Sequence, residues 1–558
     1  PEAAVPAARA AARPSSFLTD AAVLQSAALV GSLSGIWALS VTNDFIGNRV
    51  VNQYNGIFTQ TSLFPEGRGA AAGKVCTQHA PLGTFKRNVC HSNERFGFYL
   101  DNNFPRNIKR SVASNGFLDP DDFSAWRAWD RTGSCDALTA DGRDNGAVGY
   151  VEDQLEMGNA FSGQYEVGDV QFLRYHAINN LHGLYWKQTK NFADPAVTAH
   201  VKDSTFEGLH SRIGHGAVGT VSYARVEHCG QLGVAGKYCL HFHMSQACRD
   251  CVFRGNAIEH GSQRGIIVHG THRSVVEDNV LFDLKGSYLY VEDGNEMENL
   301  FKNNVALCPV KGQCKIDGTD NTNADNIHQS GMWALSVSND FIGNRFIGHE
   351  EAFFTQTSAF PHGRGAAQGR VCTQHAPLGT FRGNVCHSNN RFGFYLDNNF
   401  PRNIKRSVAS NGLISEQDFR DWLDPNVASS CDALTADGRD NGIVGFVEDQ
   451  LDIGNPFSGQ YEVGDVQYLR YHAINNLHGL YWKQTKNFAD PAVTAHVKDS
   501  VFEWTLGRAE RLGEIMGTIP TVGVGHILAP GGLGTFLLEN TVFKGDMFAA
   551  IAGNHHCG

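Results

Sequence analysis

Histidine, aspartate and arginine side chains are concentrated in residues 238–304. When the short apolar runs of this segment are aligned on their closing residues, His243, His269 and Asp293 fall in one column, 26 and 24 residues apart. Residues at such intervals would meet if the chain coils into stacked turns, because neighbouring strands of a parallel sheet lie about 4.8 Å apart. The same alignment brings four further polar residues near the column: His241, His260, Arg264 and His272.

The sequence leaves three roles open for this cluster. Two imidazoles and a carboxylate, here His243, His269 and Asp293, can bind a divalent cation. Alternatively, a His–Asp pair acts as general base while Arg264 stabilises negative charge and His260 completes the catalytic set. The residues that would contact substrate are then His241 and His272. In the third interpretation these side chains only hydrogen-bond along the sheet.

Carboxylate spacing bears on cleavage of glycosidic bonds, which ordinarily uses two carboxylates about 5 to 10 Å apart. Glu292 and Asp293 are adjacent in the sequence. On a strand they would face opposite sides of the sheet. Asp293 paired with Glu277 or Asp278 is the alternative carboxylate pair.

An internal repeat indicates which elements would position these residues. Residues 34–207 align without a gap to residues 330–503 at a constant offset of 296, with about four-fifths of the positions identical. We therefore predict a tandemly duplicated module in five segments: an N-terminal cap or residual targeting segment (1–33), the second half of a first module (34–207), rungs with the His/Asp cluster (208–329), the repeat (330–503), and C-terminal rungs or a cap (504–558).

A shorter period lies inside the module. Apolar runs such as "GIIVHG" and "SYLYVED" recur every 20 to 26 residues, and Asn256, Asn279 and Asn304 hold the same place in a second series. This spacing is typical of the rungs of a parallel β-helix, in which asparagines stack at the turns. We predict an all-β, right-handed parallel β-helix with loops or short helices inserted at 119–133, 415–429 and 503–517.

Composition narrows the class of partner. The formal net charge of −11 argues against DNA or RNA, since nucleic-acid binding relies on clustered Lys and Arg. No run of 18 or more apolar residues encodes a membrane span. A polyanionic glycan would need a local basic patch, and the motif "FPRNIKRS" supplies a candidate twice. Its basic residues are Arg106, Lys109 and Arg110, repeated as Arg402, Lys405 and Arg406.

Cysteines and tryptophans complete the predicted features. Thirteen Cys include three closely spaced pairs, Cys229/Cys239, Cys248/Cys251 and Cys308/Cys314. We interpret the pairs as disulfide candidates of an oxidising compartment, with buried thiols as the alternative. The repeated cysteines are candidates too: Cys76, Cys90, Cys135, Cys372, Cys386 and Cys431. Trp186 and Trp482 could stack on sugar rings, although a core position is also compatible with their strands.

The stretch from "VEHCGQ" through "KYCLHFHM", "AIEHGSQRGIIVHGTH" and "SYLYVEDGNEMENLF", followed by "GMWALSVSND" and "CTQHAPLGTF", resembles the cell-migration-inducing hyaluronan-binding proteins and fibrocystin-L. The resemblance covers about residues 221–550, and again 34–207. It implies a secreted or membrane-anchored β-helix that, in some members, binds and depolymerises hyaluronan with calcium dependence. The positions carried over are His241, His243, His260, Arg264, His269, Gly270, Asp293 and Gly294.

Two functions follow as hypotheses. The first is an extracellular β-helix that binds an acidic polysaccharide and, as a glycosidase or lyase, cleaves it with help from calcium. The second is a structural or adhesive surface protein whose near-identical modules assemble into a rod or filament. The duplication favours the second hypothesis, and the polar cluster with the family resemblance favours the first.

Overall fold

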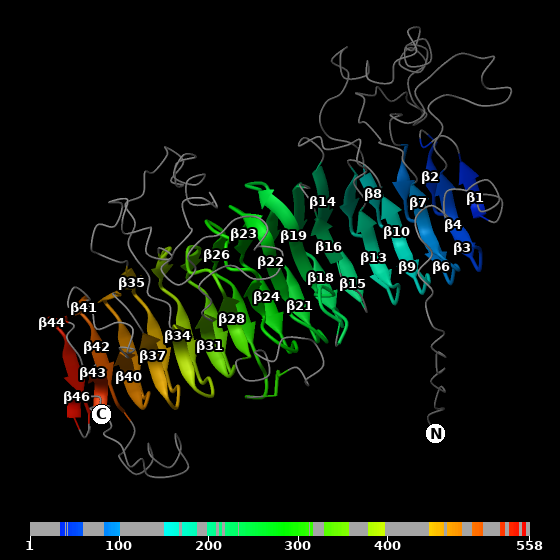
Figure 1. Ribbon diagram of the computed structural model, residues 1–558. Helices are drawn as coiled ribbons and strands as arrows, with labels where there is room; N and C mark the ends of the chain where they lie inside the picture. Colours follow the sequence, from blue (N-terminus) through cyan, green and yellow to red (C-terminus); the bar gives the residue numbers. More distant parts are fainter. Residues whose placement is uncertain are drawn as a thin grey trace, which may run out of the picture.

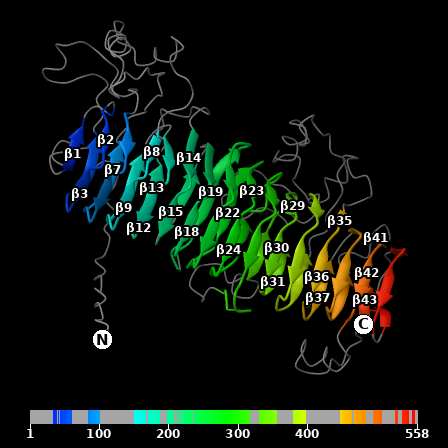
Figure 2. The same ribbon diagram turned by 180° about the vertical axis from the view of Figure 1, so that it is seen from behind.

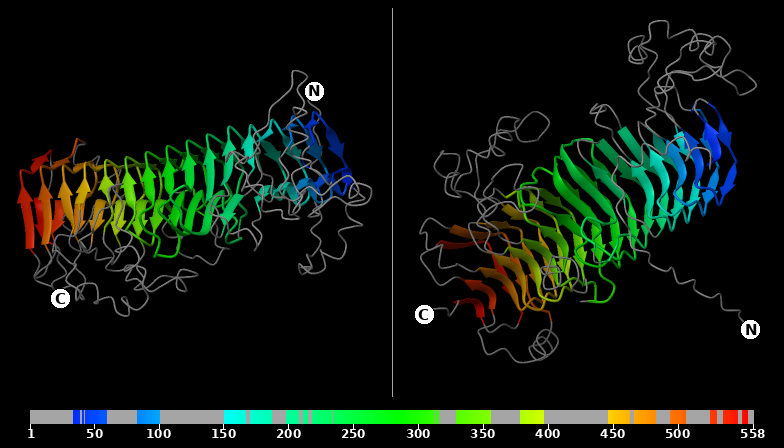
Figure 3. Two further views of the ribbon diagram at one scale, coloured as in Figure 1. Left: turned by 90° about the horizontal axis from the view of Figure 1, so that it is seen from above. Right: turned by 45° about the vertical axis from the view of Figure 1, so that its right-hand side comes forward.

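The chain winds into a parallel β-helix, as predicted, in a computed structural model (Figure 1). The structure describes residues 34–38, 41, 43–59, 83–100, 150–166, 170–186, 198–207, 211–214, 218–232, 234–311, 313–315, 329–355, 378–396, 446–462, 466–482, 494–505, 525–529, 535–545 and 549–553. Its rungs follow one another along a single axis, with the first strands at one end and the last at the other (Figure 3).

Each rung contributes one strand to each of three faces, and every pairing is parallel. The first face consists of two hydrogen-bonded sheets. The first sheet contains β1 (Ser34–Ala38), β4 (Asn55–Thr59), β7 (Phe96–Leu100), β10 (Ser162–Glu166) and β13 (His182–Trp186). The second contains β16 (Ser211–Gly214), β19 (Leu240–Ala247), β22 (Ile266–His272), β25 (Leu289–Val291), β28 (Ser330–Ala334), β31 (Glu351–Thr355), β34 (Phe392–Leu396), β37 (Ser458–Glu462), β40 (His478–Trp482), β43 (Gly525–Ala529) and β46 (Ala549–Gly553).

The second and third faces are continuous sheets (Figure 2). The second face contains β2 (Phe45–Ile46), β5 (Phe85–Lys86), β8 (Tyr150–Glu152), β11 (Gln171–Leu173), β14 (Thr198–Lys202), β17 (Val218–Ser222), β20 (Val252–Arg254), β23 (Val275–Glu277), β26 (Leu300–Lys302), β29 (Asp340–Ile342), β32 (Phe381–Arg382), β35 (Phe446–Glu448), β38 (Gln467–Leu469), β41 (Thr494–Lys498) and β44 (Thr535–Glu539). The third contains β3 (Arg49–Val51), β6 (Val89–His91), β9 (Leu155–Met157), β12 (His176–Ile178), β15 (Thr205–Glu207), β18 (Arg225–Glu227), β21 (Ala257–Glu259), β24 (Val280–Phe282), β27 (Val305–Leu307), β30 (Arg345–Ile347), β33 (Val385–His387), β36 (Leu451–Ile453), β39 (His472–Ile474), β42 (Val501–Glu503) and β45 (Val542–Lys544).

The described residues contain no helix, and therefore none long and apolar enough to cross a membrane. The N-terminal segment 1–33 lies outside the described residues. So do the three segments predicted as loops or short helices, except for residues 503–505 of the last one.

The predicted asparagine column is a hydrogen-bonded ladder at the turn between the second and third faces. The side-chain amide of Asn256 donates to Asn279 Oδ1 over 2.9 Å, and Asn279 donates to Asn304 Oδ1 over 2.9 Å. The ladder continues through Asn344 to Asn384 at 3.0 Å per step. The turn needs a left-handed residue before each asparagine, and glycine, asparagine or aspartate takes that place, as at Gly255 with φ 65° and Asp278 with φ 57°.

A single apolar core fills the interior along the whole solenoid. Inward side chains such as Phe253, Val268 and Leu281 are buried and come from all three faces. Because successive residues of a strand point to opposite sides, the three-residue strands of the second and third faces place their central residue in the core. Short strands with one inward residue explain why the sequence shows brief apolar runs instead of long ones.

The two copies of the repeat form corresponding strands, β1–β15 in the first and β28–β42 in the second. After the second copy the chain continues in the same strand order. β46 therefore occupies the place in the second module that β19 occupies in the first. β46 has the sequence AAIAG, so it repeats neither of the histidines of β19.

The three closely spaced cysteine pairs are disulfides, as predicted: Cys229–Cys239, Cys248–Cys251 and Cys308–Cys314. The prediction is wrong for Cys90 and Cys386, which are free thiols buried in the core. Both replace an apolar inward residue, at the centres of β6 and β33. The remaining repeated cysteines, Cys76, Cys135, Cys372 and Cys431, lie outside the described residues.

Each buried thiol lies beside a carboxyl group in the core, Glu156 in the first copy and Asp452 in the second. Gln154 and Asn159 donate to Glu156, and Gln450 and Gln460 donate to Asp452. Burial raises the pKa of Asp452 to about 7, although these hydrogen bonds oppose the shift. In the folded protein this carboxyl group is therefore mostly protonated below about pH 7.

Removing one member of the asparagine ladder should destabilise the fold. In Asn304→Ala, the carbonyl of Val276 and the amide of Asn279 lose partners inside the protein. We expect the free energy of unfolding to fall by about 1 to 3 kcal/mol in denaturant titrations. Asn390→Ala is the control, because its half-buried amide donates to the side chain of Glu350 and lies outside the ladder. A loss in Asn304→Ala no larger than in the control would contradict the structural role of the ladder.

Asp452→Asn should change how stability depends on pH. The folded pKa of about 7 lies above the ordinary value of 3.8, so the stabilisation by the proton is complete below about pH 4 and is lost as the pH rises through 7. Relative to wild type, the variant should gain stability between pH 4 and 8, by at most roughly 4 kcal/mol at 1.4 kcal/mol per pKa unit.

The control for this pH dependence is Asp449→Asn. The hydrogen bond from Arg470 lowers the pKa of Asp449, so this variant should lose a little stability at neutral pH instead of gaining it. Thermal melts of both variants at pH 4 and 8 make the comparison. Parallel pH profiles for wild type and Asp452→Asn would show that the core carboxyl does not titrate as argued.

Candidate functional site

The polar cluster lies on the first face, where β19, β22 and the end of β25 run side by side. The register pairs His243 with His269 across β19 and β22, as the sequence predicted. Across β22 and β25, however, Val268 pairs with Val291, so the next residue beside His269 is Glu292 and not Asp293. The predicted column is therefore displaced by one residue at its third member.

The cluster side chains point away from the core, because they alternate with inward apolar residues. Phe242, Val268 and Val291 belong to the core, and His243, His269 and Glu292 directly follow them. The imidazoles are nevertheless buried, with His241 2 % and His269 6 % exposed. The side chain of Glu292 is 24 % exposed, so the cluster reaches solvent along this side chain.

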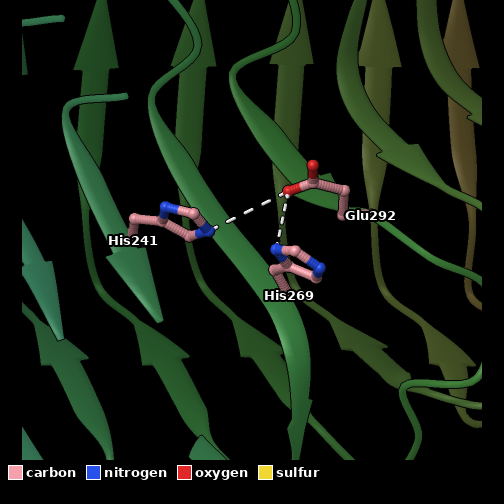
Figure 4. A group of neighbouring side chains, drawn as sticks. All are labelled: His241, His269 and Glu292. Atoms are coloured by element: carbon pink, nitrogen blue, oxygen red, sulfur yellow. Dashed lines mark ion pairs between the residues drawn. The ribbon is translucent and has the colours of Figure 1, made fainter. Parts of the chain in front are cut away.

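His241, His269 and Glu292 form the group whose ligand-type atoms converge (Figure 4). Glu292 Oε2 lies 3.5 Å from His269 Nδ1 and 3.9 Å from His241 Nε2. One nitrogen or oxygen atom from each residue lies within 4.8 Å of the others. Among the described residues this is the set that could hold a metal ion, and it shares only His269 with the predicted set of His243, His269 and Asp293.

His243 packs against the other two imidazoles instead of joining them. Its ring is nearly perpendicular to both, with centroids 5.1 Å from His241 and 4.8 Å from His269. The rings of His241 and His269 are parallel to each other, 5.8 Å apart. His243 thus borders the cluster on one side and packs against the rings of His241 and His269.

Asp293 contacts the far side of His269, with Oδ2 2.8 Å from Nε2. The prediction that Glu292 and Asp293 face opposite sides is wrong, because β25 ends at Val291 and the chain turns at Gly294, with φ 101°. Glu292 approaches Nδ1 of the same ring. The two adjacent carboxylates therefore bracket His269, one at each nitrogen.

Glu296 fixes the turn that carries Asp293. Its Oε1 accepts hydrogen bonds from the amides of Gly270 and Asp293, each over 3.0 Å, and its Oε2 accepts one from Gly294 over 2.8 Å. The β19–β22 register shifts between His243 and Gln246, just past the cluster. This irregularity redirects the chain where Gly270 meets Glu296.

Arg264 closes the other side of the cluster, as the sequence placed it. Its Nη1 donates to the hydroxyl of Tyr238 over 2.9 Å, and its guanidinium lies 4.2 Å from the centre of the Tyr290 ring. Tyr238 in turn hydrogen-bonds Glu292. A chain of contacts thus links Arg264, Tyr238, Glu292, His269 and Asp293.

The electrostatics of the cluster follow from burial and close charges. Burial raises the pKa of Glu292, although the charges of His269 and Arg264 oppose the shift. Burial would lower the pKa of His269, but the close contact with Asp293 and the charge of Glu292 raise it above its ordinary value. Burial and the charge of Asp293 raise the pKa of Glu296 to about 7. The imidazole of His269 is thus held in an environment that favours positive charge.

Two histidines predicted for the site lie elsewhere. His260 follows β21 on the third face, is stacked on His228 and forms an exposed ion pair of 2.9 Å with Asp283. His272 is buried near the end of β22, where its Nδ1 accepts from the amide of Met297, and burial lowers its pKa to about 4. The register carries these positions past the cluster, so neither takes the predicted catalytic or substrate-binding place.

The alternative carboxylate pair is not formed either. Glu277 pairs with Arg254 on the second face, and Asp278 accepts from Asn303 at a turn. Trp482 is 1 % exposed and stacks on Phe536, so it cannot bind sugar as predicted. The side chain of Trp186 lies outside the described residues, as does the repeated basic motif with Arg402 and Lys405.

Sequence reasoning considered Glu292 only as the neighbour of Asp293, not as a member of the cluster, and it missed Tyr238 and Glu296. A signal for Glu292 was present, because aligning "GIIVHG" with "SYLYVED" on their apolar residues, as the strands actually pair, places Glu292 beside His269. Tyr238 lies before β19, and Glu296 lies in the turn after β25. Those two contacts depend on chain paths that strand periodicity does not describe.

Comparisons with known proteins agree with this fold. The family described as CEMIP beta-helix matches residues 207–394, which include every residue of the cluster. Human fibrocystin-L is 27% identical over 180 residues, which covers 32% of this chain and 4% of that protein. Human cell surface hyaluronidase CEMIP2 is 27% identical over 266 residues, which covers 40% of this chain and 18% of that protein. The human cell migration-inducing and hyaluronan-binding protein is 27% identical over 213 residues, 33% of this chain and 15% of its own length. The chain thus spans less than a fifth of each of these relatives.

Glu296→Gln tests whether the turn after β25 depends on a carboxylate. In the wild type, three backbone N–H groups donate to the two carboxylate oxygens of Glu296. A side-chain amide would place an N–H group against at least one of these donors. We expect a loss of about 1 to 3 kcal/mol in the free energy of unfolding, because buried donors lose acceptors. Glu277→Gln, which alters an exposed ion pair, is the control. Equal stability of the two variants in urea would argue against this role of Glu296.

Proposed function

We propose that this protein acts at the cell surface or in the extracellular space and interacts with an acidic, glycosaminoglycan-like polysaccharide. Its residues 207–394 match the CEMIP beta-helix family. Relatives matched by the chain are named for hyaluronidase activity or hyaluronan binding. The three disulfides support an oxidising compartment.

The observation that carries the proposal is the cluster itself. Charged and ionisable groups on a solenoid face normally stand in water, whereas His241, His269 and Arg264 are buried together beside a partly exposed Glu292. Arranging such groups out of water is costly unless they are paired. A cluster of this kind in which burial and charge shift several pKa values is a candidate binding or reaction centre.

Depolymerisation of the glycan at this cluster is the finer proposal. Cleaving a uronate-containing chain requires a base and a group that stabilises negative charge. The imidazoles of His241 and His243 are candidates for the base. Arg264, whose charge acts on Glu292, is the candidate for the group that stabilises negative charge. The order of these groups along the first face would let an extended glycan lie across neighbouring rungs.

A structural role for the repeated rungs is the second candidate. The second copy rebuilds the strands of the first, but β46 carries no histidine where β19 carries two. Copying rungs without the cluster lengthens the solenoid without multiplying the site. In this function, near-identical modules would assemble into an extended rod or filament, which negative-stain electron microscopy of the purified chain would reveal.

Incubation with a panel of uronic-acid polysaccharides, followed by measurement of chain length and of binding, tests the first function. We expect binding to at least one polysaccharide and a loss of about tenfold or more in His269→Ala. His260→Ala should match wild type, because that imidazole is exposed on another face. Ultraviolet absorbance of an unsaturated uronate would separate lyase from hydrolase products. No binding and no cleavage across the panel would remove this proposal and leave the rod.

A further inference from the structure

We propose that His241, His269 and Glu292 bind a divalent transition-metal ion such as zinc, and that this ion, not calcium, is the cation of the cluster. The proposal rests on the function proposed above only where it assigns the ion a role toward an acidic glycan. The site itself is argued from the geometry of the three side chains.

The distances suit one ion between the three residues. Bonds of about 2.0 to 2.2 Å from an ion to two ligand atoms span a separation of up to about 4 Å. The separations of Glu292 Oε2 from His269 Nδ1 and His241 Nε2 are 3.5 and 3.9 Å. Both exceed the roughly 2.7 to 3.2 Å of an ordinary N–H···O hydrogen bond. Glu292 Oε2 thus lies near both imidazoles without an ordinary hydrogen bond to either, and the ligand atoms of the two imidazoles lie within 4.8 Å of each other.

Glu292 supplies a second observation. Its Oε2 is buried and makes no hydrogen bond to any of the described residues, although it faces two imidazole nitrogens. A buried carboxylate oxygen that has long ion-pair contacts but no hydrogen bond is costly. An ion bound between the three groups would satisfy this oxygen. The partly exposed Glu292 side chain also provides the path by which an ion and further ligands could enter.

Asp293 gives His269 the surroundings of a metal-binding histidine. A ligating imidazole almost always donates its other ring N–H to a carboxylate or carbonyl, which fixes its tautomer and orientation. His269 Nδ1 faces Glu292, and its Nε2 lies 2.8 Å from Asp293 Oδ2. Glu296 in turn fixes the turn of Asp293 through the backbone amides of Asp293 and Gly294. Asp293 is therefore a positioning residue, not a ligand.

The donor set decides between metals. Calcium takes six to eight oxygen ligands at about 2.3 to 2.6 Å and has little affinity for imidazole. Two imidazole nitrogens and one carboxylate oxygen are the ligands that zinc and other first-row transition-metal ions bind, with remaining positions open to water or substrate. The carboxylate of Asp293 is engaged with His269 on the far side of the ring. The described residues of the cluster therefore fit a transition-metal ion.

The ion would also resolve a conflict of charge in the proposed function. Glu292, Asp293 and Glu296 place three carboxyl groups in the cluster. Any of these groups that is ionised and not offset by Arg264 or His269 would repel the carboxylates of an acidic glycan. A bound divalent cation would reverse the local sign at Glu292 and present an open ligand position to a uronate carboxylate.

Direct metal binding tests the site without glycan. Protein without a polyhistidine tag is stripped with chelator, and Zn²⁺, Mn²⁺ and Ca²⁺ are titrated separately by calorimetry. We expect about one Zn²⁺ per chain and at least tenfold weaker binding of Ca²⁺. His241→Ala, His269→Ala and Glu292→Gln should each lower Zn²⁺ affinity by at least about tenfold, and Asp293→Asn by about 10- to 100-fold.

Three controls distinguish this site from other metal-binding side chains. His243→Ala should retain Zn²⁺ affinity within a few-fold, because His243 packs edge-on against the two ligand rings. His260→Ala should be unchanged, because that imidazole pairs with Asp283 on the third face. The double variant His555→Ala/His556→Ala tests the histidines near the C-terminus, and binding should persist in it. Circular dichroism and thermal melts confirm that each variant is folded.

Absence of stoichiometric Zn²⁺ binding by the folded wild type, or Ca²⁺ binding that is tighter than Zn²⁺ binding, would overturn the assignment. So would Zn²⁺ affinity that survives His241→Ala and Glu292→Gln but is lost in His243→Ala. If His269→Ala fails to fold, the partly exposed Glu292→Gln still decides the question. Zn²⁺ binding without any glycan interaction would retain the site and remove only the proposed function.

Discussion

The stacking of successive rungs in register is the constraint on which the rest of the molecule depends. Asn256, Asn279 and Asn304 hold that register, because each side-chain amide bonds the next asparagine and a backbone carbonyl of an earlier strand. A rung displaced by one residue would break these bonds and also turn its inward side chains outward. Amide ladder and apolar core therefore favour the same alignment.

Register alone brings His243 beside His269, but the cluster needs departures from regular strands. β25 ends at Val291, and the turn that follows allows Glu292 and Asp293 to approach the same imidazole from opposite sides. Glu296 holds that turn through backbone amides. The regular strands of the solenoid thus hold the imidazoles, and the irregular turn after β25 places the two carboxylates beside His269.

The two modules share their regular strands and differ in the polar cluster. The strands of the repeat are rebuilt with the same order and partners, and each copy keeps a buried carboxyl group, Glu156 or Asp452, beside a buried thiol. The imidazoles of β19 have no counterpart in β46. These interior features of the repeated rungs are retained in both copies, whereas the cluster on the first face occurs at one level of the described solenoid. Binding at one level and mechanical length elsewhere are compatible in one molecule.

The sequence by itself determined the fold, since the spacing of apolar runs and of Asn256, Asn279 and Asn304 already required stacked rungs. It also indicated the three closely spaced cysteine pairs as disulfide candidates and the neighbourhood of His243, His269 and Arg264. Only the tertiary structure decided which side chains meet, because one residue of register exchanges Glu292 for Asp293 beside His269, and the turn then returns Asp293 to the other nitrogen. His260 and His272 were lost from the site for the same reason: proximity along the chain does not say which face a residue occupies. Periodicity describes regular strands, and the decisive contacts of this cluster are made where a strand ends.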